Sequence, residues 1–125
     1  MRLEAEKLLF TIYAEINSIS PVMEGITADR LGFDRETFNR ALNILYTGGY
    51  ISGVEIKFGD EETQDAAVSY SNALLTRKGA EYVEGLTGLD ADMSKLDKLK
   101  LLHRKALEWG WQEVAALAEQ AIKEY

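Results

Sequence analysis

The strongest constraint on the fold lies in residues 34–78, where the order of secondary-structure signals can be followed without a break. Apolar residues recur at helical spacing over 34–47, and this pattern ends at the pair Gly48-Gly49. Two runs of strand-forming residues follow, with a polar, acidic loop between them. Thr76 then has the position of an N-cap for another helix. The segment therefore predicts a helix, a β-hairpin and a second helix.

Two more helices are predicted ahead of this segment. Residues 2–17 carry an apolar stripe typical of an amphipathic helix. Thr27 and Asp34 are both favourable N-cap residues, and Gly32 between them suits the end of a short helix. A short helix, a tight turn and the longer helix at 34–47 describe a helix-turn-helix. The predicted fold class is therefore α+β: a winged helix-turn-helix with a three-helix core, a β-hairpin wing and a C-terminal helical extension.

The pattern changes near residue 85, which predicts a winged-helix domain at 1–85 and a helical extension at 86–125. Apolar stripes over 94–109 and 111–124, separated by Gly110, indicate a helical hairpin. This hairpin would serve packing or dimerisation. The sequence leaves open whether it packs on its own chain or on a second copy.

The overall charge argues against a dedicated DNA-binding protein. The chain has 21 acidic and 14 basic residues and a net charge of −7. Because counterion release from phosphates drives most duplex binding, a DNA-binding protein of this composition would need a local basic patch. Cysteine is absent, which excludes disulfides and thiolate metal sites. No apolar run approaches the roughly 20 residues that span a bilayer, and no signal-peptide pattern is found, so we expect a cytoplasmic protein.

Cationic and amide side chains at the predicted helix-turn-helix and hairpin suit contacts with DNA. Arginine can bind guanine and asparagine can bind adenine from a helix in the major groove. Cations at the ends of neighbouring elements would contact phosphates. For each of them the alternative is an ordinary solvated charge, and Asp34 and Glu36 weaken the positive field. The predicted DNA-binding residues are Arg30, Arg35, Asn39, Arg40, Asn43, Lys57, Arg77 and Lys78.

Two other groups favour a protein partner. Asp60, Glu61 and Glu62 in the predicted wing would repel phosphate and would match a basic protein surface. Trp109 and Trp111 flank a helix break, and tryptophan is frequent among the anchor residues of protein interfaces. The alternative for the two tryptophans is a place in the core.

The C-terminal extension also contains a basic stretch. A second anion-binding face is one interpretation, and the exposed side of a helix whose leucines pack is the favoured one. Its cations are Lys95, Lys98, Lys100, Arg104 and Lys105.

No residues with catalytic or metal-binding spacing are found in the sequence. His103 is the only histidine, and no other ligand of zinc is suitably spaced from it. Motifs of serine hydrolases, phosphate-binding loops and zinc proteases are absent. We therefore expect no enzyme, no cofactor and no metal.

Two local motifs enter and leave the predicted hairpin. They are Leu42-x-x-Leu45-x-x-Gly48-Gly-Tyr50-Ile51 and Leu75-Thr-Arg-Lys-Gly79-Ala-Glu-Tyr82-Val83. Together they resemble bacterial winged-helix proteins, and among these the small YjcQ-type family of Gram-positive bacteria and their prophages. The resemblance covers residues 3–84 and implies the fold more than the activity. The chain departs from the pattern in its acidic wing, where DNA-binding wings carry Arg or Lys, and in residues 86–125, which extend past it.

Two function hypotheses follow. The first is a winged-helix DNA-binding protein, a phage-related or bacterial transcriptional regulator. It would form a homodimer through its C-terminal helices and bind double-stranded DNA. The second is a protein-interaction module or inhibitor that uses an acidic surface against a basic nucleic-acid-binding partner. The first requires that neighbouring carboxylates leave the cations of residues 35–43 unneutralised.

Overall fold

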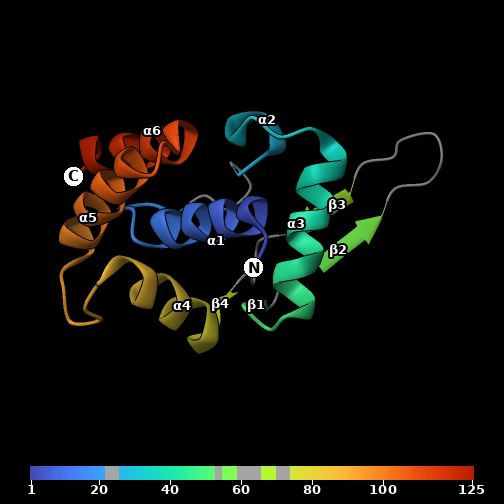
Figure 1. The fold of residues 1–125 in the computed structure, drawn as a ribbon, viewed down its shortest axis with the longest axis horizontal. Coiled ribbons are helices and arrows are strands. Elements are labelled where there is room, and N and C mark those ends of the chain that lie inside the picture. The colour runs from blue at the N-terminus through green and yellow to red at the C-terminus, as the bar shows by residue number, and fades with distance from the viewer. Residues whose placement is uncertain (22–25, 53–54, 59–65, 70–73) are drawn as a thin grey trace.

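The computed structural model describes residues 1–21, 26–52, 55–58, 66–69 and 74–125 (Figure 1). Helices make up more than half of the chain. Those of the described residues are α1 (Leu3–Ile16), α2 (Ala28–Leu31), α3 (Arg35–Thr47), α4 (Arg77–Thr87), α5 (Lys95–Glu108) and α6 (Gln112–Lys123). The strands are β1 (Ile51–Ser52), β2 (Glu55–Phe58), β3 (Ala66–Ser69) and β4 (Leu74–Leu75).

The predicted α+β winged-helix class is wrong, because the protein is mostly helical. In the described ranges the strands form two separate antiparallel ladders, β1 with β4 and β2 with β3, and no wing packs as a sheet layer on the helices. The β1–β4 ladder is only two residues long, with Ile51 opposite Leu75. The β-branched residues correctly indicated strands locally. They did not indicate that the strands would contribute little to the core. The core is enclosed mainly by helices packed on α1.

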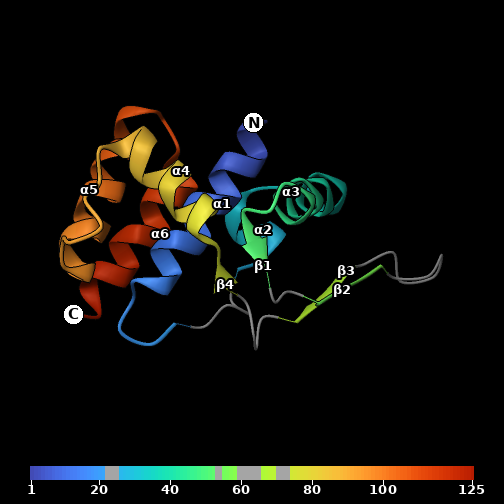
Figure 2. The same ribbon diagram turned by 90° about the horizontal axis from the view of Figure 1, so that it is seen from below.

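Helix α1 lies at the centre and explains the helical class. It contacts α3, α4, α5 and α6, and Figures 1 and 2 show these helices arranged around it. An amphipathic helix would bury only one face, whereas in α1 every position from 8 to 14 is buried, and Ala5 as well. Its buried residues are Ala5, Leu8, Leu9, Phe10, Thr11, Ile12, Tyr13 and Ala14.

One core cluster includes buried residues from both predicted parts of the chain. Leu42 and Leu45 of α3 belong to it, as do Leu99 and Leu102 of α5 and Val114 of α6. Whether residues 1–85 and 86–125 fold as separate domains stays a prediction.

The helix starts follow local chemistry, as expected from the sequence. Thr27 accepts a hydrogen bond from the Arg30 N–H, and Asp34 accepts one from the Thr37 N–H. Thr76 and Ser94 cap α4 and α5 in the same way. These caps orient α3 and α4, the two helices that carry most of the predicted DNA-binding residues.

Two tyrosine–glutamate hydrogen bonds join α1 to α4. Tyr13 Oη donates to Glu84 Oε2 at 3.1 Å, and Tyr82 Oη donates to Glu6 Oε2 at 3.0 Å. Burial, followed by the nearby Glu84 carboxylate, raises the pKa of Tyr13 far above its ordinary value. Burial and the hydrogen bond to Glu6 raise the pKa of Tyr82 to about 12. Both bonds therefore need a protonated phenol.

We expect the bond from Tyr82 to make the fold sensitive to alkaline pH. Its pKa is about 12 in the folded chain and about 10 in an unfolded chain. The stabilisation is therefore complete below about pH 10 and is lost as the pH rises toward about 12. Thermal unfolding followed by circular dichroism over this range would measure the decline. Tyr82→Phe should reduce the decline, and an equally steep fall in that variant would contradict the assignment.

Candidate functional site

Helix α3 places its predicted DNA-binding residues on or near the surface. Phe38, Ala41, Leu42 and Leu45 form its buried face. On the opposite side Arg35, Arg40 and Asn43 are exposed, and Asn39 is half-buried. Figures 1 and 2 show α3 at the outside of the helical assembly. The polar face predicted from the sequence therefore exists.

Carboxylates on the same helix offset the positive charge of this face. Arg40 Nη2 lies 3.1 Å from Glu36 Oε1, in a hydrogen-bonded ion pair one helical turn apart. Asp34 precedes the helix, and its hydrogen bonds with Thr37 hold the pKa of this carboxyl below its usual value. At neutral pH the two arginines, Arg35 and Arg40, are thus matched by two ionised carboxylates. The DNA hypothesis requires cations that neighbouring carboxylates do not neutralise, and Arg40 does not meet this requirement.

Lys78 binds the C-terminal end of α3. Its Nζ donates a hydrogen bond to the carbonyl oxygen of Gly48 at 2.7 Å and lies 4.6 Å from the centroid of the Tyr50 ring. A cation at this position satisfies a terminal carbonyl and interacts favourably with the helix dipole. From the sequence, Lys78 was assigned to phosphate because it lies at the end of a neighbouring element, and its hydrogen bond to the end of α3 was missed.

The other predicted phosphate contacts are scattered. Arg77 Nε lies 3.6 Å from Glu81 Oε1 on the same helix, in a highly exposed pair that stabilises little. Lys57 belongs to β2, and its side chain lies outside the described residues. Asp60, Glu61 and Glu62 of the predicted protein interface also lie outside the described residues.

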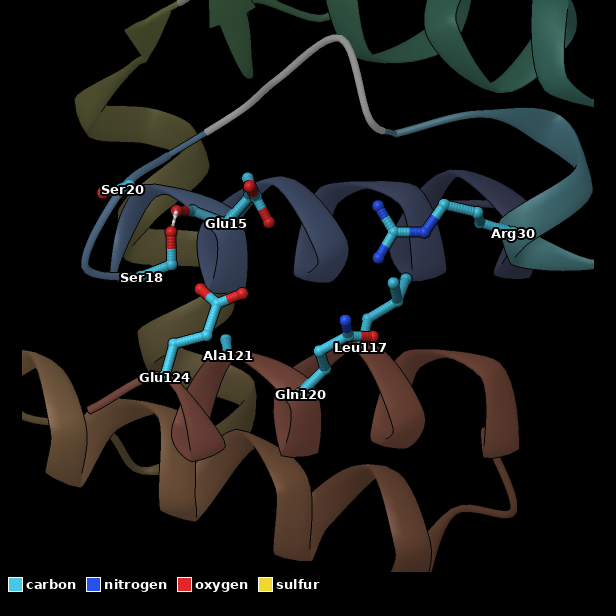
Figure 3. A pocket seen from close by; sticks show the side chains of 8 residues that line it. All are labelled: Glu15, Ser18, Ser20, Arg30, Leu117, Gln120, Ala121 and Glu124. Carbon is cyan, nitrogen blue, oxygen red and sulfur yellow. Dashed lines mark hydrogen bonds between the residues drawn. The ribbon is translucent and has the colours of Figure 1, made fainter.

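Arg30 lines a small polar pocket between the end of α1, α2 and α6. The pocket has a volume of about 180 Å³. Figure 3 shows the Arg30 guanidinium and the Glu15 carboxylate both facing its interior. Its lining residues are Glu15, Ser18, Ser20, Arg30, Leu117, Gln120, Ala121 and Glu124. Arg30 is therefore directed toward carboxylate-bearing helices of its own chain.

The two tryptophans have different environments. Trp111 is 8% exposed and belongs to the core, which was the alternative to an interface role. Trp109 is 38% exposed. The two indoles and the buried Phe10 ring form a cluster, with centroids 4.8 to 5.5 Å apart. Only Trp109 of this cluster can contact a partner with a substantial part of its side chain.

Metal chemistry and membrane insertion find no support in the described part of the chain. No group of three or more His, Cys, Asp or Glu side chains there is placed to hold a metal ion. Among the described helices, none has both the length and the apolar character required to cross a bilayer.

Comparison with known proteins identifies one family. Neither a curated protein nor a solved structure matches the chain. The model of the family described as YjcQ protein matches residues 7–99, which include α1 from residue 7 onward, α2, α3, α4 and the first turn of α5. Because this match covers well over half of the sequence, the chain belongs to the YjcQ family.

Proposed function

We propose that the protein is a protein-interaction module whose acidic surface binds a basic partner. The observation that carries this proposal is that cations expected to contact phosphate instead contact groups of their own chain. Lys78 bonds to the end of α3, Arg40 pairs with Glu36, and Arg77 pairs with Glu81. With a net charge of −7, the protein would repel a phosphate backbone and attract a basic surface.

A nucleic-acid-binding protein is the partner class that fits this surface. Such a protein presents Lys and Arg to phosphates, and carboxylates can occupy the same positions. Asp90 and Asp92, which follow α4, are exposed carboxylates that take part in no ion pair within the described residues. The half-exposed ring of Trp109 would add an apolar anchor. An inhibitor of a basic nucleic-acid-binding protein is the specific role that we propose.

Affinity purification with charge-matched variants tests this proposal. We expect the wild-type protein to retain a basic partner, and the triple variant Asp60/Glu61/Glu62→Ala to lose it. The control Glu113/Glu119/Glu124→Ala makes the same change in net charge on and next to α6 and should keep the partner. Equal retention by both triple variants, or equal loss from both, would contradict binding through the residue 60–62 carboxylates.

Duplex DNA remains a second candidate because α3 has an outward polar face with Arg35, Arg40 and Asn43 exposed. If this face binds DNA, log affinity falls linearly with log salt concentration. Glu36→Gln should then tighten binding, because it removes a carboxylate and releases Arg40 from its ion pair. Fluorescence anisotropy with a labelled duplex measures both effects. Absence of binding at low salt would remove this candidate and leave the protein-partner proposal in place.

A further inference from the structure

Helix α5 has an outer face that the fold leaves uncovered. Its inner face buries Leu99, Leu102 and Ala106 against neighbouring helices, chiefly α6. Figures 1 and 2 both show α5 along one outer edge of the molecule. Most of this helix also lies beyond residue 99, where the family match ends. Its outer face therefore lies largely outside the matched region.

The outer face consists of residues at helical spacing, which we call the α5 outer stripe. Its members are Asp97, Lys100, Leu101, Arg104, Leu107 and Glu108. All are exposed except the half-buried Leu101, and Leu107 is 56% exposed. Glu108 Oε2 lies 3.5 Å from Lys105 Nζ. Within the described part of the chain, Asp97, Lys100 and Arg104 take part in no ion pair. The stripe thus combines available charges of both signs with an exposed leucine.

We propose that the α5 outer stripe binds the same stripe of a second copy, with the two helices antiparallel. A two-fold interface requires a surface that is complementary to itself. If the axis passes between positions 100 and 101, Asp97 of each copy faces Arg104 of the other, so the opposite charges meet twice. Leu107 of each copy then lies against Met93 and Ser94 of the other. Leu101 lies beside the axis and completes the apolar contact.

The distribution of charge favours a second copy over nucleic acid as the occupant. A phosphate backbone would meet Asp97 within the stripe and the exposed Asp90 and Asp92 just before α5. It would also leave Leu107 without an apolar contact. An antiparallel copy places Asp97 opposite Arg104 and covers Leu107 at the same time. The helix has 14 residues and is about 21 Å long, so the buried area is small and we expect a weak, reversible dimer.

Sedimentation velocity over a wide concentration range tests the proposal, and the test is independent of what partner the protein binds. We expect the dimer fraction to rise with protein concentration. Arg104→Asp and Asp97→Arg should each weaken dimerisation by about tenfold or more, because two attractive contacts become repulsive. The double variant Asp97→Arg/Arg104→Asp should restore the dimer, since the exchanged charges again face each other.

Two controls separate this interface from general effects of charge. Lys123→Asp makes the same change in charge as Arg104→Asp at an exposed position of α6, and it should leave dimerisation unchanged. Circular dichroism should show all variants folded, because positions 97, 104 and 123 are exposed. A wild-type chain that stays monomeric at the highest concentration overturns the proposal. A dimer insensitive to Arg104→Asp, or a double variant as weak as the single ones, also overturns it.

Discussion

Replacing Phe10 by alanine is expected to destabilise the protein by about 3–5 kcal/mol, because it opens a cavity in the core. Phe10 is fully buried in α1. Its ring makes edge-on contacts with Trp109 and Trp111, at centroid distances of 5.5 and 5.1 Å. Such aromatic pairs contribute about 0.5–1.5 kcal/mol beyond the area they bury. Urea unfolding followed by far-ultraviolet circular dichroism measures the loss.

Trp109→Ala is the matched control for this prediction. It removes a larger ring from the same aromatic cluster, but that ring is 38% exposed. We expect it to cost less than about 2 kcal/mol, since exposed area contributes little to folding and partial collapse can fill the space. If Trp109→Ala were the more destabilising of the two, α1 would not be the element that organises the core.

The second large effect is expected for Gly79→Ala at the start of α4. An added Cβ atom would lie 2.2 Å from the carbonyl oxygen of Tyr50 and 2.9 Å from Leu75 Cδ1. The Tyr50 carbonyl cannot move away without losing its hydrogen bond from the Thr76 N–H, at 3.2 Å. We therefore expect a loss of about 3 kcal/mol or more in the free energy of unfolding.

Gly85→Ala is a control on the same helix. No atom outside the local backbone lies within 4 Å of a Cβ built there, so the substitution meets no obstacle. Alanine favours the helix, and we expect a gain of about 0.5–1 kcal/mol. Denaturant unfolding of both variants under the same conditions makes the comparison. Similar changes for Gly79→Ala and Gly85→Ala would show that the close contact with Tyr50 does not constrain α4.

The elements that sequence reasoning predicted well depend on residues close together in the chain. The cap of α3 joins Asp34 to Thr37, and the cap of α4 joins Thr76 to Gly79. Gly49 adopts a φ of +79° after α3, at the glycine pair where the helix was expected to end. In each case three or four consecutive residues contain the donor, the acceptor and the conformational freedom required.

The candidate site was harder to predict because the partners of its charged side chains lie at very different separations along the sequence. The pair of Glu36 and Arg40 has i,i+4 spacing and could have been anticipated. Lys78 and Gly48 are 30 positions apart, and their contact depends on the path between α3 and α4. The hydrogen bond between Tyr13 and Glu84 spans 71 positions, and nothing in the neighbouring residues indicates it.

Local sequence therefore specified where the helices begin and how they are capped, because those preferences act within one or two turns. Packing decided the rest. It placed α4, α5 and α6 around α1, although the sequence had left open where residues 86–125 pack, and it put Trp111 in the core. It also turned Lys78 toward the end of α3. These outcomes depend on competition among apolar faces and partners far apart in the chain, and only the folded arrangement resolves that competition.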